Sequence, residues 1–142
     1  MSEVRDKTIL AIDYGEKRIG LAKSDPTGII ASTVGTLEVK SFDDALKKVR
    51  EQIEVYEPQE IVIGYPLLKS GDKSAKCIQV DKFVEKLADF YKKPIHKVDE
   101  SWTSHEAAAV IHAHGKRIGK KKERVDRLAA AIILQRFLNE HK

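Results

Sequence analysis

Short apolar runs separated by turn residues predict five β-strands. They cover residues 8–12, 18–24, 29–37, 60–64 and 94–98. The first run is apolar on both faces, as in a central strand, and it stops at Asp13. A polar turn around Gly15 joins it to the second strand, and the turn residues 25–28 lead into the third. The sequence therefore predicts a hairpin followed by a third strand.

Apolar residues recur at helical spacing in four further segments. The predicted helices cover residues 41–57, 74–91, 103–114 and 122–139. Ser41 is predicted to cap the first helix, which ends before Pro58. Thr103 and Glu106 have the spacing of a capping box at the start of the third. The inner face of the second helix is predicted to include Ile78, Phe83, Leu87 and Phe90.

The order of these elements, three strands followed by alternating helices and strands, is typical of an α/β fold. Hairpin connections make the first three strands antiparallel, and helical crossovers make the remaining strands parallel. We therefore expect a mixed five-stranded sheet flanked by helices. The chain has no internal repeat, low-complexity tract or linker-like stretch, so we expect residues 1–142 to form a single domain.

The composition is that of a soluble globular protein, because 42% of the 142 residues are hydrophobic and 34% are charged. No apolar run approaches the roughly 18 residues that a membrane span requires. Residues 1–7 lack the pattern of a secretory signal. The single cysteine, Cys77, excludes a disulfide framework and a cysteine-based zinc cluster, and we expect it to pack in the core. These features predict a cytoplasmic protein with no membrane partner.

The net charge of +4 is small, but the basic residues are concentrated toward the C-terminus. Residues 101–142 hold nine basic and four acidic side chains. The excess lies in Lys116, Arg117, Lys120, Lys121, Lys122, Arg124 and Arg127. Such a cluster favours contact with a polyanion such as a nucleic-acid backbone. The alternative is a solvated helix start and loop that bind no ligand.

Three acidic residues are candidates for chemistry. Asp13 and Glu100 end predicted buried strands, and reactive groups in open α/β sheets gather at the carboxyl ends of strands. Asp126 lies in the first turn of the last helix and continues its apolar stripe, which comprises Ala129, Ala130, Ile133 and Phe137. Asp126 is therefore expected to face inward. The alternative for this residue is interaction with the helix N-terminus and a surface salt bridge.

Three carboxylates in one crevice repel one another unless protons or a cation neutralise them. Magnesium suits such a site because it prefers oxygen ligands and is commonly held by one or two carboxylates with substrate phosphates; Mn²⁺ is the alternative ion. Two ions about 3.5–4 Å apart would activate water for attack on a phosphodiester. A metal site at His105, His112 and His114 is less favoured, because a continuous helix points the last two to different sides.

Motifs along nearly the whole chain resemble those of the YqgF (RuvX) family. They are residues 13–20 (DYGEKRIG), Ser24-Asp25, residues 61–67 (IVIGYPL), Asp99-Glu100 and residues 125–130 (VDRLAA). The resemblance implies an RNase H-like fold related to that of the RuvC resolvases. It also implies that Asp13, Glu100 and Asp126 are the catalytic and metal-binding acids. Members are described as Holliday junction resolvases and, in bacteria, as the nuclease that matures the precursor of small-subunit ribosomal RNA.

One position departs from the family pattern. The family usually follows its Asp-Glu pair with arginine, whereas Ser101 stands here. If that arginine steadies the acids or contacts phosphate, a neighbouring cation such as Lys17 or Arg18 has to replace it. His114, next to Gly115 at a predicted helix end, is a further candidate for phosphate contact.

The leading hypothesis is a Mg²⁺-dependent endonuclease, a hydrolase that acts on structured nucleic acid and processes the 5′ end of pre-16S ribosomal RNA in ribosome biogenesis. The alternatives are a resolvase of four-way DNA junctions and a non-catalytic nucleic-acid-binding or ribosome-associated module, which Ser101 would suit. A phosphotransferase on a related fold ranks last, because the chain shows no nucleotide-binding loop. A junction resolvase needs two active sites, whereas RNA trimming does not, so monomer and homodimer both remain open.

Overall fold

A five-stranded mixed sheet forms the centre of the molecule. The computed structural model describes residues 8–99 and 121–140, and the side chains of the last helix from Arg127 onward. The strands are β1 (Ile9–Asp13), β2 (Arg18–Ser24), β3 (Ala31–Glu38), β4 (Glu60–Gly64) and β5 (Ile95–Val98). They lie in the order β3-β2-β1-β4-β5; β1, β2 and β3 pair antiparallel, and β4 pairs parallel with both β1 and β5. The predicted mixture of directions is confirmed.

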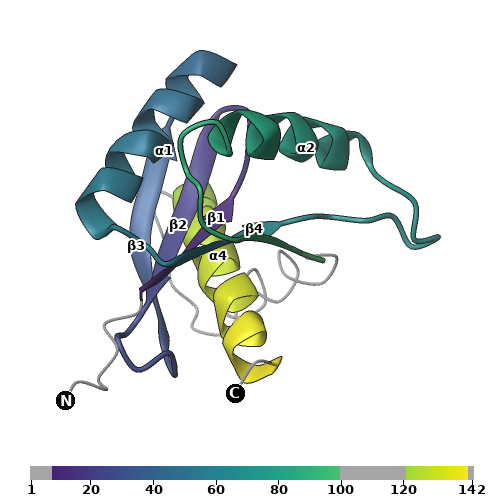
Figure 1. Cartoon of the computed structure of the whole chain (residues 1–142). Coiled ribbons are helices and arrows are strands. Elements are labelled where there is room, and N and C mark those ends of the chain that lie inside the picture. Colours follow the sequence, from purple (N-terminus) through teal and green to yellow (C-terminus); the bar gives the residue numbers. More distant parts are fainter. Residues whose placement is uncertain (1–7, 100–120, 141–142) are drawn as a thin grey trace.

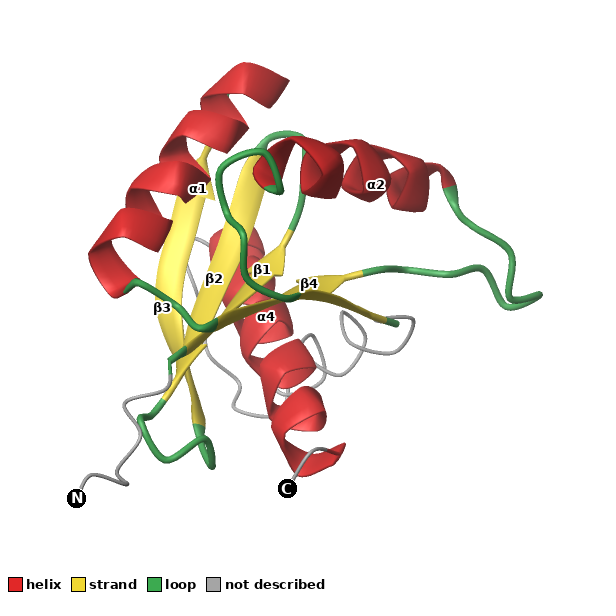
Figure 2. Ribbon diagram, viewed as in Figure 1, coloured by secondary structure: helices red, strands yellow, loops and turns green. Residues whose placement is uncertain are grey.

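Helices cover both faces of this sheet (Figures 1 and 2). α1 (Phe42–Tyr56) and α2 (Ala75–Leu87) pack on one face, and α4 (Lys121–Glu140) packs on the other. Ser41 caps α1, as predicted, because its side chain accepts a hydrogen bond from the Asp44 N–H. None of the described helices combines the length and the apolar character needed to span a membrane.

Each face of the sheet has its own apolar core, because side chains alternate between the two faces along every strand. Toward α1 and α2 the strands contribute Leu10, Ile12, Ile19, Leu21, Ile61 and Ile63. Toward α4 they contribute Ile9, Ala11, Ala22 and Val62. The predicted apolar stripe of α4 is confirmed, since the structure buries Ala129, Ala130, Ile133 and Phe137.

The second predicted helix is shorter than expected, and one of its inner residues was assigned wrongly. α2 ends at Leu87, after which the Phe90 N–H bonds the Leu87 carbonyl in a turn. Phe83 is buried as predicted, but Ile78 is exposed. Val80 faces the sheet, and a residue two positions away points about 200° around the helix from it. Cys77 is buried, as expected.

The third strand begins at Ala31, two residues later than predicted. Ile29 and Ile30 are instead exposed in the turn that precedes it. Their N–H groups donate to the Asp25 carboxylate at 2.8 and 2.7 Å, so the turn is longer than its sequence signal indicates.

Candidate active site

Asp13 ends the central strand β1, as the sequence predicts. Its side chain is buried, with 6% of the residue exposed. Ile9 and Ala11 pack against α4, so strand alternation places Asp13 on the same face of the sheet. In the sheet it pairs with Gly20, which in turn pairs with Thr36. A carboxylate is thus fixed at the edge where α/β proteins place reactive groups.

The first part of α4 lies level with Asp13. Arg127 Nε donates to Thr36 Oγ1 at 3.4 Å, and Thr36 belongs to the same row of the sheet as Asp13. Farther along α4, the Gln135 side chain accepts the Ala31 N–H at the opposite end of β3. α4 therefore runs from the carboxyl end of β1 toward its amino end.

The structure does not describe the side chains of the other predicted acids and of several predicted basic residues. Asp126 belongs to α4 by its backbone, one residue before Arg127. Only the backbone is likewise described for Lys121, Lys122 and Arg124. The residues outside the described ranges are Glu100, Ser101, His105, His112, His114, Lys116, Arg117 and Lys120. The convergence of the three acids remains a prediction.

A cation that the sequence analysis did not single out lies beside Asp13. Lys76, the second residue of α2, places its Nζ atom 3.7 Å from Asp13 Oδ1. The Lys76 side chain is 38% exposed, so the ion pair borders solvent. α2 follows β4, the parallel neighbour of β1, and this connection brings its first turn to the end of β1. A lysine in the first turn of the helix that follows β4 is the sequence signal that could have indicated this contact.

Lys17 and Arg18, the candidates to replace the missing arginine, follow Asp13 in the chain. Lys17 is exposed, and Arg18 starts β2 with its side chain half-buried. The turn between the strands is tight, because a Cβ atom on Gly15 would lie 2.5 Å from the Arg18 carbonyl oxygen. Only glycine fits there without displacing the backbone. This glycine is therefore required by the turn that follows Asp13.

The Ser24-Asp25 motif has a structural role at the opposite end of the sheet. The buried Ser24 Oγ accepts the Ile9 N–H at 2.9 Å and joins β2 to β1. The Asp25 carboxylate closes the hairpin turn, and the Thr27 hydroxyl is one of its donors. That hydroxyl and the Ile30 N–H hold the pKa of Asp25 well below its usual range. Both residues of the motif therefore stabilise the hairpin.

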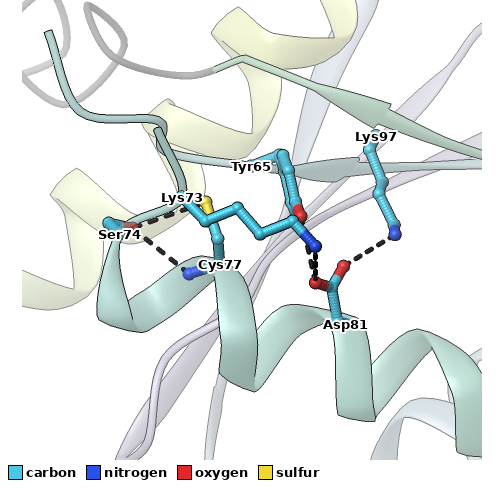
Figure 3. A network of polar contacts seen from close by, with 6 residues as sticks. All are labelled: Tyr65, Lys73, Ser74, Cys77, Asp81 and Lys97. Atoms are coloured by element: carbon cyan, nitrogen blue, oxygen red, sulfur yellow. Dashed lines mark hydrogen bonds and ion pairs between the residues drawn. The ribbon is translucent and has the colours of Figure 1, made fainter. Parts of the chain in front are cut away.

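A second polar cluster, the Asp81 cluster, lies at the carboxyl ends of β4 and β5 (Figure 3). The Asp81 carboxylate on α2 accepts hydrogen bonds from Tyr65 Oη at 3.0 Å, Lys73 Nζ at 2.9 Å and Lys97 Nζ at 2.7 Å. The Lys97 ammonium also lies over the Tyr65 ring, 5.1 Å from its centroid. Lys97, followed by Lys73, lowers the pKa of Asp81 to about 2, so this carboxylate is charged at neutral pH.

Comparison with known proteins identifies the family. The model of the RuvX family, described as Holliday junction resolvase, matches residues 7–140. This chain belongs to the RuvX family. A protein of Koribacter versatilis (strain Ellin345) named "Putative pre-16S rRNA nuclease" is 44% identical over 130 residues, which are 92% of this chain and 85% of that protein. A Chlorobium luteolum (strain DSM 273 / BCRC 81028 / 2530) protein of the same name is 39% identical over 94% of this chain and 95% of its own length.

The fold of this RuvX-family chain is similar to that of solved junction resolvases. Thermus thermophilus RuvC in complex with a Holliday junction substrate has a TM-score of 0.61 and 16% identity, and the match covers 95% of each chain. The Fowlpox virus resolvase in complex with Holliday junction DNA has a TM-score of 0.62 and 10% identity over 94% of this chain and 98% of that one. The predicted RNase H-like, RuvC-related fold is confirmed.

The described oxygen donors of this RuvX-family chain suit a hard divalent cation at one position. Within residues 8–99 and the described part of α4, no three His, Cys, Asp or Glu side chains are grouped as a metal site. Of the three predicted metal ligands, Asp13 is the one whose side chain is described. Its carboxylate is the type of ligand that Mg²⁺ prefers. Lys76 supplies a positive charge beside it. Asp13 therefore offers one carboxylate ligand to a divalent cation, and such a cation would compete with Lys76 for it.

Proposed function

We propose that this chain is a divalent-metal-dependent endonuclease that processes the 5′ end of pre-16S ribosomal RNA. Family membership and the names of relatives at 44% and 39% identity support this activity. The observation that carries the proposal is the buried Asp13 carboxylate at the carboxyl end of β1, level with the start of α4. Burial of a carboxylate carries a desolvation cost that Lys76, partly exposed and 3.7 Å away, offsets only in part, which favours a functional role at this edge.

We assign the catalytic and metal-binding roles to Asp13, Glu100 and Asp126. Two described neighbours support the assignment of the last two. Val98, two residues before Glu100, ends β5 and packs on the α4 side of the sheet. Arg127, which follows Asp126, lies level with Asp13. When bound to these carboxylates, Mg²⁺, or Mn²⁺ as the alternative, supplies activation of water and neutralises the departing oxygen.

The residues of the chain itself bind and orient the substrate in this proposal. Asp13 is held by its strand and by its burial, so its oxygens keep one position relative to the substrate. Nucleic-acid-binding roles are assigned to Lys17, Arg18, His114, Lys116, Arg117, Lys120, Lys121, Lys122 and Arg124. Their charges attract the phosphate backbone without reading its sequence. The names of the relatives support a precursor ribosomal RNA as the partner, encountered at the ribosome or during its assembly.

A resolvase of four-way DNA junctions is the second candidate function. The description of the family model names that activity, and two structures of the same fold are those of junction resolvases. Both candidates hydrolyse a phosphodiester with the same three acids, so the substrate distinguishes them. A junction has two strands to cut symmetrically and would require a homodimer, whereas RNA processing is possible for a monomer.

Cleavage assays with matched variants test the proposal. Wild-type protein is compared with Asp13→Asn, Glu100→Gln and Asp126→Asn on a pre-16S rRNA fragment and on a synthetic four-way DNA junction. Each reaction contains Mg²⁺, Mn²⁺ or EDTA. Asp89→Asn changes an exposed acid beyond the C-terminal end of α2 and is the control. We expect wild type and Asp89→Asn to cut the precursor RNA when metal is present, and the other three variants to leave it intact.

Three outcomes would change the conclusion. Undiminished cleavage by both Asp13→Asn and Asp126→Asn, at equal folded fraction, would remove the assigned roles. Symmetric cutting of the DNA junction with the precursor RNA left intact would reverse the order of the two candidates. RNA binding that falls steeply with salt, without cleavage in either metal, would favour a non-catalytic binding module.

A further inference from the structure

The Asp81 cluster contains two lysine ammonium groups that bind one carboxylate (Figure 3). Asp81 Oδ2 binds Lys73 at 2.9 Å, and Asp81 Oδ1 binds Lys97 at 2.7 Å. Two ammonium groups share one carboxylate, so the group of three carries a net positive charge. The side chains of Lys73 and Lys97 are 58% and 40% exposed, which makes both accessible to a ligand.

The cluster lies at the same carboxyl edge of the sheet as Asp13, on the face covered by α2, whereas strand alternation places Asp13 on the α4 face. Tyr65 directly follows β4, and Lys97 is the next-to-last residue of β5, so both lie at carboxyl ends of strands parallel to β1. α2 links the two places: Lys76 contacts Asp13, and Asp81 lies five residues later, about 7.5 Å along the helix axis. Asp81 also lies about 140° around the helix axis from Lys76, so a strand that reaches both places has to pass around α2. Each strand of a duplex has a phosphate about every 3.4 Å along its axis, so two to three nucleotides span the axial part of this separation.

We propose that Lys73 and Lys97 form a binding site for backbone phosphates of the nucleic-acid strand that enters the active site. The inference rests on the proposed function, because it requires a nucleic-acid substrate at Asp13. The site belongs to the loop before α2 and to β5. It is therefore distinct from the basic residues 116–127 that the sequence analysis singles out.

The arrangement of the pair suits a phosphate group. Each ammonium has three N–H donors, and the bond to Asp81 uses one of them, so donors remain for phosphate oxygens. The Asp81 bonds and the Tyr65 ring under Lys97 restrict the two side chains, which lowers the entropy lost when they bind a ligand. Asp81 also competes with the phosphate for the same donors. In the proposal this competition outweighs the ordering of the side chains, so Asp81 limits the affinity of the two lysines for phosphate.

The alternative role of the cluster is to attach the loop after β4 to α2 and β5. The two roles predict different signs for the effect of Asp81→Asn on nucleic-acid binding. If the cluster only attaches the loop, loss of Asp81 loosens the same contacts as loss of either lysine, and the variants behave alike. If the lysines bind phosphate, Asp81→Asn removes a competing negative charge and strengthens binding, whereas Lys73→Gln and Lys97→Gln weaken it.

Equilibrium binding to a fluorescein-labelled RNA hairpin with a single-stranded 5′ extension separates these roles. EDTA is present throughout, so that binding is measured without cleavage. We expect Lys73→Gln and Lys97→Gln each to reduce the magnitude of the negative slope of log K against log salt by about 0.7–0.9. Asp81→Asn should tighten binding by about two- to fivefold, the effect of one partly screened charge contact. Lys97→Arg, which keeps the charge, should retain the wild-type slope.

Lys86→Gln is the matched control, because Lys86 is an exposed lysine in the last turn of the same helix. It should change neither the affinity nor the salt slope, and urea unfolding confirms that every variant is folded. Wild-type slopes for both lysine variants, or weaker binding by Asp81→Asn, would overturn the phosphate site. Cleavage is a separate readout. If RNA binding depends on the two lysines but no RNA is cleaved, the phosphate site stands and the proposed nuclease activity is wrong. If cleavage depends on Asp13 but the salt slopes of the lysine variants are unchanged, the nuclease activity stands and the phosphate site is wrong.

Discussion

The two ends of the central sheet use their polar residues differently. At the amino end of β1 and β4, polar side chains form closed pairs with the backbone. Ser24 Oγ accepts the Ile9 N–H at 2.9 Å, and the buried Tyr91 hydroxyl donates to the Pro58 carbonyl at 2.8 Å. Each pair satisfies a backbone group that would otherwise be buried without a partner. This end holds strands and loops together.

At the carboxyl end, charged groups are instead balanced by other charges that border solvent. Asp13 lies 3.7 Å from the partly exposed Lys76, and Asp81 binds Lys73 and Lys97. A dissolved cation can take the place of an ammonium, and a phosphate can take the place of a carboxylate, at small cost when the pair is exposed. Hydrogen bonds to the backbone therefore distinguish the amino end of the sheet, although Glu60 and His96 also form a partly exposed pair there. The charge pairs at Asp13 and Asp81 mark the binding end.

The largest expected effect is that of Asp13→Asn on cleavage. We expect the rate to fall ~1000-fold, or about 4 kcal/mol of transition-state stabilisation, because a metal-binding oxygen is lost. The free energy of unfolding should change by ~1 kcal/mol or less, since asparagine has the same size and the partly exposed Lys76 is readily solvated. Single-turnover cleavage and urea unfolding measure the two quantities. A loss of stability that accounts for the loss of activity would make Asp13 a structural residue.

Ser24→Ala tests the other end of the sheet. It should lower the free energy of unfolding without lowering the cleavage rate. The substitution leaves the buried Ile9 N–H without its acceptor, which costs about 1–3 kcal/mol of unfolding free energy. The cleavage rate of the folded variant should equal that of wild type, because Ser24 lies at the far end of β1 from Asp13. Urea unfolding and cleavage at low temperature provide the test. Reduced cleavage at full folding would show that the two ends are coupled.

Much of the fold could be predicted because burial leaves a local pattern in the sequence. The strand Glu60–Gly64 is found with its observed ends, since it is an apolar run bounded by polar and turn residues. The prediction fails at Ile78, which is apolar but exposed. It lies about 140° around the helix from Phe83 and about 200° from Val80, so it falls outside the buried stripe of α2.

The part of the candidate site that lies at a strand end could be predicted from the sequence. Asp13 follows from the end of a buried run, whereas Lys76 and the Asp81 cluster depend on where α2 lies relative to β1 and β5. Lys73 and Lys97 come from separate elements, and no spacing rule joins them. Relative placement of elements, which periodicity does not encode, is therefore what sequence analysis missed.

Lys76→Gln tests whether the charge pair at Asp13 is exchangeable. Lys76 neutralises Asp13 in the absence of a divalent cation, so its removal should strengthen cation binding. A partly exposed ion pair contributes about 0.2–1 kcal/mol, which corresponds to a roughly two- to fivefold lower Kd for Mn²⁺. Calorimetric titration with Mn²⁺, without nucleic acid, measures the change. Weaker Mn²⁺ binding by Lys76→Gln would indicate that Lys76 holds the carboxylate in place rather than competing with the ion.

The smallest effect concerns two carboxyls whose pKa values are lowered by different means. The pKa of Asp25 is lowered first by the Thr27 hydroxyl and by backbone N–H groups, whereas that of Asp81 is lowered to about 2 first by the Lys97 ammonium. The ordinary value is about 3.9. The contribution of Asp81 to stability is therefore complete above that value and is lost as the pH falls through about 2.

Salt should separate the two carboxyls, because it screens an ion pair more than hydrogen bonds that a carboxylate accepts from neutral donors. At ~1 M salt the Debye length falls to about 3 Å, so the attraction between Asp81 and its lysines weakens and the pKa of Asp81 should rise. The pKa of Asp25 should stay low, since its donors are the Thr27 hydroxyl and backbone amides. Carboxyl NMR titrations at low and high salt measure both values. An equal response of the two carboxyls would mean that charge pairing does not distinguish the two ends of the sheet.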